Sequence, residues 1–206
     1  SVHDDLRVLR DGELDRRRGG VEVRALGAHG GVEQLGGAGR LAVDVRVGRA
    51  ELRVVNAHFE AFDAAVRTAQ ATQLVTEVIG SEGNRAATVV LGDINCRPPG
   101  CRPTLERMPA AAHEVDGDAY EVLAASGLID AWAAAQPSDP CGGHTSGQAA
   151  DLRNPVSTLD QRIDVVFADP ALAVRQVDLV GAHQDDRTTC GLWASDHACL
   201  VVGLEG

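Results

Sequence analysis

The amino-acid sequence predicts an α+β or layered α/β fold, because segments with the two-residue period of strands are interspersed with segments of helical period. The chain has 206 residues, 44% of them apolar, which is enough for one domain with a sizeable core. Glycine and proline separate the periodic segments, and we find neither an internal repeat nor a clear linker. We therefore expect a single domain over residues 1–206, poorly defined at residues 1–38.

Two neighbouring segments in the first third of the chain have the pattern of a β-hairpin. Apolar and polar side chains alternate over residues 41–47, which predicts a strand with one buried face. After a turn, residues 52–59 predict a second strand, with Leu52, Val54, Asn56 and His58 on one face. Upstream, Val21 and Val23 predict a short edge strand.

A long amphipathic helix is expected over residues 63–79. Apolar side chains such as Val66 and Leu74 recur at helical spacing and form one stripe. Asp63 is positioned to cap the first turn, and Gly80 is expected to end the helix.

The rest of the chain predicts four further strands and one helix. Residues 87–92 are apolar without alternation, which predicts a strand buried on both faces. A second helix is expected over about residues 117–126, ending at Gly127, followed by a short apolar segment at residues 128–132. Three further strands are expected at residues 162–168, 174–180 and 198–204.

The charge and hydropathy of the chain narrow the classes of function. The formal net charge is −11, which weighs against tight nonspecific binding of nucleic acid, although a local field can still permit a nuclease. No run of about 18 apolar residues exists, so no membrane span is expected. No signal-peptide pattern is visible, and the localisation stays open between cytoplasmic and secreted.

The five cysteines do not form a metal-binding pattern. They are Cys96, Cys101, Cys141, Cys190 and Cys199. No CxxC pair is present, so no zinc site is predicted. Cys199 lies in an apolar run and is expected in the core. A disulfide among the cysteines in loops is an open alternative.

Polar side chains that can take part in catalysis stand at the edges of four predicted strands. They are Asn56 and His58, Asp93 and Asn95, Asp164, and Asp196 with His197. Burying carboxylates and imidazoles is costly unless they are paired or bind a metal, so several of them at one rim of a sheet indicate a site.

Each of these residues also has a purely structural interpretation. The alternatives are turn formation by Asp93 and Asn95 before two prolines, a core histidine at His58, pairing of Asp164 with Arg162 or capping of a loop, and capping of the last strand by Asp196 and His197. Independent structural reasons for all four places are less expected than a shared site.

The order of these motifs resembles the endonuclease/exonuclease/phosphatase superfamily, which includes the DNase I-like nucleases. The matching segments read VVNAHFE, VVLGDIN, LDQRIDVVF and ASDHACLVV, and the resemblance extends from about residue 40 to the end of the chain. It implies a four-layer αββα sandwich, with two sheets face to face and helices outside. It also implies hydrolysis of phosphate esters by a metal-activated water.

The resemblance assigns roles to the residues that bind the metal and the phosphate. Asp196 and Asp93 are expected to hold Mg²⁺ or Mn²⁺, hard cations that prefer oxygen ligands. Asp93 is also expected to orient or deprotonate the attacking water. Asn95 and His58 are expected to hydrogen-bond the phosphate and stabilise the transition state.

The resemblance also implies a pair of residues for proton transfer. His197 is expected to donate to a phosphoryl oxygen or to transfer a proton, and Asp164 to orient its ring. On the helix at residues 63–79, Arg67 and Gln70 are expected either to brace the site or to lie on a solvated face.

Two N-terminal motifs of the superfamily are missing from this sequence. One is a first strand that ends in Asn, and the other is a strand that ends in Gln-Glu, whose Glu is the principal metal ligand. The upstream glutamates, none at the end of a buried apolar strand, are Glu13, Glu22, Glu33 and Glu51. The sequence therefore predicts an N-terminally incomplete domain with missing strands.

Two hypotheses for the function follow. The first is a metal-dependent phosphoesterase, whose substrate is a small-molecule or lipid phosphodiester rather than long nucleic acid, given the negative charge. The alternative is a catalytically inactive remnant that acts at most as a binding or structural module.

Overall fold

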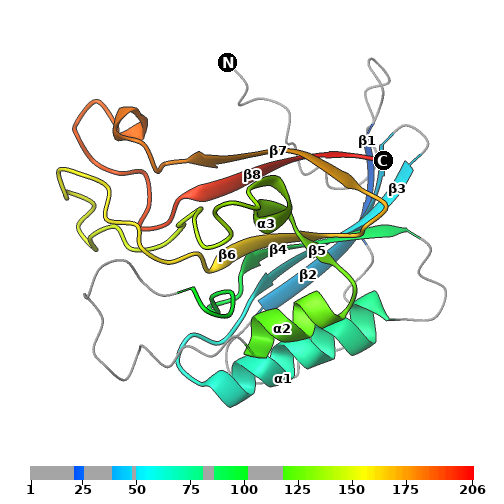
Figure 1. Ribbon diagram of the computed structural model, residues 1–206. Helices are drawn as coiled ribbons and strands as arrows, with labels where there is room; N and C mark the ends of the chain where they lie inside the picture. Colours follow the sequence, from blue (N-terminus) through cyan, green and yellow to red (C-terminus); the bar gives the residue numbers. More distant parts are fainter. Residues whose placement is uncertain (1–20, 26–38, 48–49, 81–85, 102–117) are drawn as a thin grey trace.

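The computed structural model describes residues 21–25, 39–47, 50–80, 86–101 and 118–206, which form two sheets and several helices (Figure 1). The larger sheet has the strand order β1-β2-β3-β4-β6-β5, and the smaller sheet pairs β7 with β8. The strands are β1 Val21–Ala25, β2 Gly39–Val47, β3 Ala50–His58, β4 Ala87–Asp93, β5 Ile129–Asp130, β6 Asp164–Ala168, β7 Ala173–Val180 and β8 Cys199–Glu205. The helices are α1 Ala64–Leu74, η1 Val75–Ile79, α2 Asp118–Ala125, α3 Ala131–Ala135 and η3 Gln184–Asp186.

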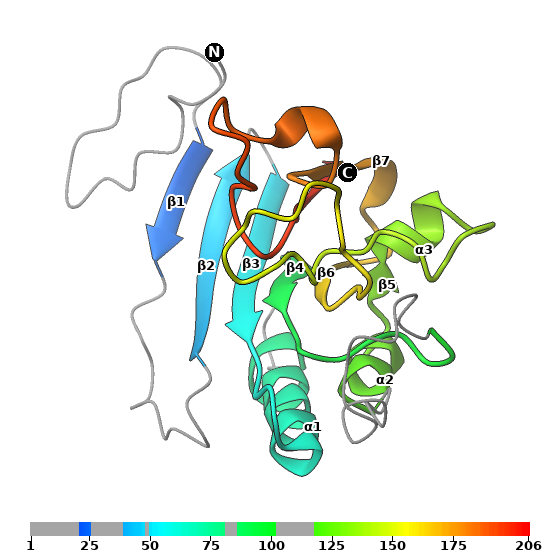
Figure 2. The same ribbon diagram turned by 90° about the vertical axis from the view of Figure 1, so that its left-hand side faces the viewer.

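The predicted hairpin is confirmed, and it forms one side of the larger sheet. β2 and β3 pair antiparallel, with Leu41 opposite Asn56 and Val45 opposite Leu52. β1 pairs antiparallel with β2 at the edge of the sheet, which confirms the predicted edge strand. Figure 2 shows these three strands side by side.

β4 lies in the middle of the larger sheet, as its unbroken apolar sequence predicted. It runs parallel to β3 and antiparallel to β6. Its residues Thr88, Val89 and Val90 are buried. A central strand whose two faces are both packed against other elements is typically rich in apolar residues without alternation.

The described residues form three layers, with α1 and α2 below the larger sheet and the smaller sheet above it (Figure 1). A core cluster that includes Leu74, Val90 and Phe167 fills the space below the larger sheet. A second cluster, which includes Val166 and Leu200, packs the two sheets face to face. The α+β class and the DNase I-like pairing of sheets are thus confirmed, and the described part of the chain supplies three of the four expected layers.

The helix predicted at residues 63–79 forms with a change of geometry near its end. Asp63 caps it as predicted, because its carboxylate accepts hydrogen bonds from Ala65 N and Val66 N. The α-helical geometry ends at Leu74, and Val75–Ile79 continues as a π-helix.

Three other expectations need correction or a finer description. The apolar segment at residues 128–132 divides between β5 and the start of α3. The strand expected from residue 162 begins at Asp164. Cys199 is exposed, so its expected place in the core is wrong, because the alternation along β8 turns Leu200, Val202 and Leu204 toward the larger sheet instead.

One disulfide joins two of the loop cysteines. Cys101 and Cys141 are bonded, with 5.2 Å between their Cα atoms and 40 residues between them in sequence. Cys101 follows the turn after β4, and Cys141 lies in the loop after α3. The disulfide therefore connects two segments that the sheet itself does not pair. None of the described helices has the length and apolar character needed to cross a membrane.

A buried ion pair connects α2 and α3, the helices before and after β5, with the segment that leads into β6. Arg162 Nη1 donates to Asp130 Oδ2 over 2.7 Å, and Arg162 Nη2 donates to Pro140 O over 2.8 Å. Both side chains of the pair are almost fully buried. Asp130 Oδ2 also accepts from the Tyr120 hydroxyl over 2.6 Å. Asp130 Oδ1 caps α3 by accepting from Trp132 N.

The buried surroundings of this ion pair also affect the pKa of Tyr120. Burial, followed by the negative charge of Asp130, raises the pKa of Tyr120 well above its ordinary range. The raised pKa favours the protonated phenol, which is the form that donates the hydrogen bond to Asp130. The sequence alternative in which Arg162 pairs with Asp164 is wrong, because the arginine is committed to Asp130.

We expect the Arg162→Met substitution to lower the free energy of unfolding by about 3–5 kcal/mol, because it leaves the Asp130 carboxylate buried without its cation. The matched control is Arg175→Met, which removes an exposed pair with Glu205 and should cost less than about 1 kcal/mol. Urea denaturation measures both. Equal costs for the two substitutions would contradict the importance of the buried pair.

Candidate active site

The rim of the larger sheet gathers polar residues from remote segments. His58 ends β3, Asp93 ends β4, and Asp164 begins β6. Because β3 and β4 are parallel and β6 runs the other way, these three positions meet at one edge. Asp93 and Asp164 are directly paired in the register of β4 and β6.

Gly92 allows the end of β4 to lie close to β3. Its φ is +127°, and a Cβ atom there would lie 2.1 Å from the Ala57 carbonyl oxygen. Any side chain would therefore clash with the neighbouring strand as well as strain the backbone. Glycine at this position fixes where the following residue, Asp93, leaves the sheet.

The turn after Asp93 is held by the side chains of its own acid and amide. Asn95 has a φ of +48°, a conformation that Asn tolerates better than most residues. Its backbone N donates to Asp93 Oδ1 over 2.8 Å. Its Nδ2 donates to Phe59 O over 2.9 Å, and Phe59 N in turn donates to Asp93 O. The turn formation considered from the sequence and a place in the site are thus both true.

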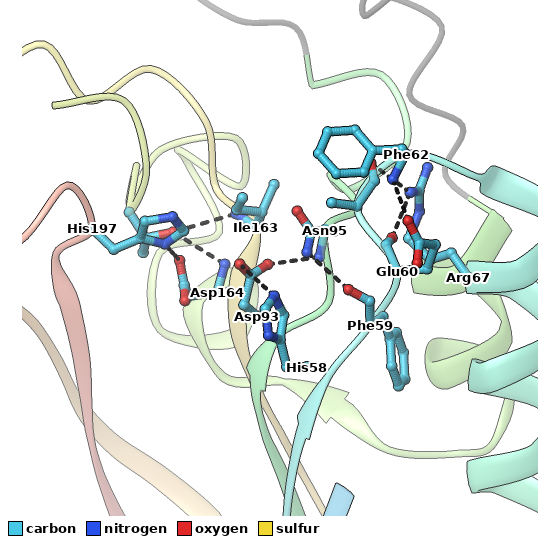
Figure 3. A network of polar contacts seen from close by, with 12 residues as sticks. His58, Phe59, Glu60, Phe62, Arg67, Asp93, Asn95, Ile163, Asp164 and His197 are labelled. Atoms are coloured by element: carbon cyan, nitrogen blue, oxygen red, sulfur yellow. Dashed lines mark hydrogen bonds and ion pairs between the residues drawn. The ribbon is translucent and has the colours of Figure 1, made fainter. Parts of the chain in front are cut away.

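Asp164 and His197 form a hydrogen-bonded pair. His197 Nδ1 donates to Asp164 Oδ2 over 2.7 Å (Figure 3). This bond is the main cause that raises the pKa of His197, against the opposing effect of burial. Because Nδ1 is occupied, Nε2 is the ring atom that can act on a substrate.

Asp93 lies beside this pair in a partly buried position. One ligand atom from each of Asp93, Asp164 and His197 falls within 4.8 Å of the others. Burial raises the pKa of Asp93, and the nearby charge of Asp164 adds to it, whereas the hydrogen bond from Asn95 N opposes it. A carboxylate with a raised pKa is better suited to accept a proton than an ordinary one.

His58 and Asp196, which the sequence also predicted for the site, lie at the margin of this cluster. His58 is exposed, with its Nε2 3.7 Å from Asp93 Oδ2, so the core-histidine interpretation is wrong. Asp196 is also exposed, and its carboxylate accepts from Ser195 Oγ over 3.2 Å. Asp196 raises the pKa of His197 through its charge, but its carboxylate is outside the cluster of three.

Thr145 is a further residue of the site that the sequence did not indicate. It is fully buried, and its Oγ1 accepts from Ile163 N over 3.3 Å and from Asp164 N over 3.1 Å. Its carbonyl oxygen accepts from Ala198 N over 2.7 Å. One threonine thus fixes the backbone on both sides of the pair of Asp164 and His197. A single threonine in a glycine-rich loop carries no signal for such a role.

Arg67 and Gln70 brace the loop that follows β3. Both are buried, so the solvated helix face considered from the sequence is wrong. Arg67 Nη1 donates to Glu60 O over 2.8 Å and to Ala61 O over 3.2 Å. Gln70 Oε1 accepts from Glu60 N over 2.8 Å.

The donor set at the rim fits a hard divalent cation in part. The carboxylates of Asp93 and Asp164 are oxygen donors of the kind that Mg²⁺ prefers, but Asp164 Oδ2 already accepts the hydrogen bond from His197. Mg²⁺ retains several waters in most protein sites. Glu51 does not add to this set, because it lies near the end of β3 opposite His58 and pairs with Arg46. Glu22 in β1 pairs in register with Arg46, at the same remote end. Glu13 and Glu33 lie outside the described residues.

No family model and no curated sequence matches the chain. Several solved structures match it. The crystal structure of D. rerio TDP2 with a single-strand DNA product has a TM-score of 0.60 and 18% identity, covering 90% of this chain and 67% of that one. An endonuclease/exonuclease/phosphatase protein from Bacteroides vulgatus has a TM-score of 0.56 and 18% identity, covering 81% and 54%. The chain has the endonuclease/exonuclease/phosphatase fold.

The resemblance seen in the motifs is thereby confirmed at the level of this fold. A third structure, a mannosyl-6-phosphatase from Bacteroides thetaiotaomicron, has a TM-score of 0.51 and 17% identity, covering 81% of this chain and 57% of that one. The chain spans between about half and two thirds of the length of these three proteins. The matches to these three structures cover 81% to 90% of this chain, so most of its length belongs to the shared endonuclease/exonuclease/phosphatase fold.

We expect Asp164→Asn to lower the pKa of His197 toward its ordinary value of 6.5, because the charged acceptor is lost. In the unsubstituted protein the folded state binds this proton more tightly than the unfolded chain. The resulting stability is complete below pH 6.5 and is lost as the pH rises through the raised pKa. The variant should therefore lose less stability over this range. NMR titration of the His197 ring in EDTA gives the pKa, and equal values in both proteins would contradict the pairing.

We expect Thr145→Val to lower the free energy of unfolding by about 1–3 kcal/mol, because two buried backbone N–H groups lose their acceptor. Thr145→Ser keeps the oxygen and removes only a methyl group, so it should lose about 1 kcal/mol. Urea denaturation compares the two variants. If serine is as damaging as valine, the methyl group rather than the hydroxyl carries the effect.

Proposed function

We propose that the chain is a metal-dependent hydrolase of phosphate esters that uses a metal-activated water. The observation that carries this proposal is the cluster of Asp93, Asp164 and His197 within 4.8 Å at the rim of the sheet. The mannosyl-6-phosphatase among the structures of the same fold supports phosphoester hydrolysis as the class of reaction. The matched proteins are longer than this chain, so the activity of this chain itself is part of the proposal.

The proposed metal ligands are Asp93 and Asp196, with water molecules completing the coordination of Mg²⁺ or Mn²⁺. Of the two, the geometry favours Asp93, because its carboxylate is in the cluster and that of Asp196 is outside it. When bound, the cation would neutralise charge on the phosphate and lower the pKa of a coordinated water.

The chain supplies the groups that bind the phosphate and move protons. Asp93 orients the attacking water or accepts its proton, a role that its partly buried place in the cluster supports. His58 donates to a phosphate oxygen from the open side of the site. Asn95 offers the N–H of its amide that is not bonded to Phe59 O.

His197 is the proposed general acid and the main donor to the phosphoryl group. Its raised pKa keeps the ring protonated to higher pH than an ordinary histidine. Asp164 holds the ring through Nδ1, so that Nε2 faces the reacting group. A positioned imidazole of this kind contributes about 10²–10⁴-fold to the rate.

The substrate that we propose is a small-molecule or lipid phosphodiester. The net charge of −11 repels a long polyanion, and none of the proposed phosphate-binding residues is an arginine. D. rerio TDP2 was crystallised with single-strand DNA, but this chain differs by its acidic balance from a typical nucleic-acid binder.

The alternative is an inactive remnant that binds a ligand or has a structural role. The observation that favours it is the place of Glu22 and Glu51, both remote from the rim. Neither can replace the glutamate that serves as principal metal ligand in the superfamily. Turnover that depends on a metal separates the two hypotheses.

We expect the purified protein to release nitrophenolate from bis(p-nitrophenyl) phosphate with Mg²⁺ or Mn²⁺ and not with EDTA. His197→Ala should reduce kcat/KM by about 100-fold or more, because it removes the proposed general acid. The matched control is His183→Ala, an exposed histidine that precedes η3, which should keep its activity. Absence of turnover from folded protein with either metal would favour the inactive remnant.

A further inference from the structure

One aromatic side chain near the candidate site is fully exposed. The chain has three phenylalanines, of which Phe59 and Phe167 are buried in the core, whereas Phe62 is 98% exposed. Phe62 lies in the short loop between β3 and α1, three residues after Phe59. A whole phenyl ring in water is unfavourable and gains nothing from the described packing of the chain.

The loop that carries Phe62 is held in place on both sides. Phe62 N donates to Glu60 Oε1 over 3.0 Å. The buried side chains of Arg67 and Gln70 bind the backbone of Glu60, and Arg67 also binds Ala61 O. The exposure of the ring is thus a property of a braced backbone rather than of a loose end.

The same loop is joined directly to the candidate site. Asn95 Nδ2 donates to Phe59 O, and Phe59 N donates to Asp93 O. At about 3.6 Å per residue, the Cα of Phe62 is at most about 11 Å from that of Phe59. In Figure 3 the ring of Phe62 extends from its loop toward the side on which Asn95 and Asp93 lie.

We propose that Phe62 is a specificity-determining residue, whose ring stacks on an aromatic or heteroaromatic group esterified to the phosphate. This inference rests on the proposed hydrolysis of phosphate esters and names a substrate class for it, in which the phosphate carries an aryl ring or a nucleobase. A phenyl ring offers a flat apolar face that favours an aromatic partner. Stacking of one base on an aromatic side chain is worth roughly 5- to 150-fold in affinity.

The surroundings of Phe62 disfavour the other occupants. Phe62 is the one large apolar side chain exposed in the loop between β3 and α1, and a single ring is far smaller than a protein or membrane docking surface. The neighbours Glu60 and Asp63 are acidic and repel an anionic membrane. A single group of the substrate matches the size of this surface.

The test compares ligands that differ only in the ester group. Phenyl phosphate, thymidine 5′-monophosphate and ethyl phosphate are titrated with Mg²⁺ into the full chain and into Phe62→Ala, followed by protein NMR. We expect Phe62→Ala to weaken phenyl phosphate by roughly 5- to 100-fold and to leave ethyl phosphate within about twofold. Loss for thymidine 5′-monophosphate as well extends the class to nucleobases, and loss for phenyl phosphate alone restricts it to aryl esters.

Two control variants separate stacking from a general change of the loop. Phe62→Tyr keeps the ring and should keep the preference for phenyl phosphate. Val156→Ala removes another exposed apolar side chain, 63% exposed, and should change no affinity. The proposal is overturned if Phe62→Ala binds all ligands as the unsubstituted protein does, or weakens the ethyl and phenyl esters equally.

The outcome for the proposed function is read separately in the turnover of bis(p-nitrophenyl) phosphate. A preference for aromatic esters without turnover would retain the stacking surface and overturn hydrolysis. Turnover without a preference that depends on Phe62 would retain hydrolysis and overturn the stacking surface. Failure of the unsubstituted protein to bind any of the three phosphates, together with absence of turnover, would overturn both.

Discussion

The pairing of Asp93 with Asp164 across β4 and β6 is the constraint around which the rim is built. Two like charges at directly opposed positions are unfavourable, so the neighbouring groups must compensate them. His197 compensates Asp164 through its hydrogen bond, and Asn95 N compensates Asp93. Burial is the main cause that raises the pKa of Asp93, and the charge of Asp164 adds to it.

The frame behind the rim keeps this pairing from relaxing. Thr145 fixes the backbone at Asp164 and beside His197, and the buried pair of Arg162 with Asp130 anchors the segment that enters β6. These contacts are made by side chains with almost no exposure to water, where loss of one partner is costly. The backbone of the site is therefore held by buried side chains, as precise positioning of reacting groups requires.

The sequence could predict what local periodicity and motif order encode. The hairpin, the buried β4 and the grouping of Asp93, Asp164 and His197 follow from these signals. It could not predict that Arg162 selects Asp130 over its near neighbour Asp164, because that choice is made by tertiary packing. Cys199 was misplaced because an unbroken apolar run does not reveal which alternate residues face the core.

The strand order has a consequence for how the protein folds. β2 and β3 are neighbours in sequence and can pair early, whereas β6 can join β4 only when the long segment between them, which contains α2, β5 and α3, brings its two ends together. The disulfide between Cys101 and Cys141 spans 40 residues of that segment, so in the oxidised chain it lowers the entropy cost of bringing the ends together. Since the candidate site needs β4, β6 and the segment before β8 together, the cluster of Asp93, Asp164 and His197 should assemble last, which makes its formation a sensitive indicator of complete folding.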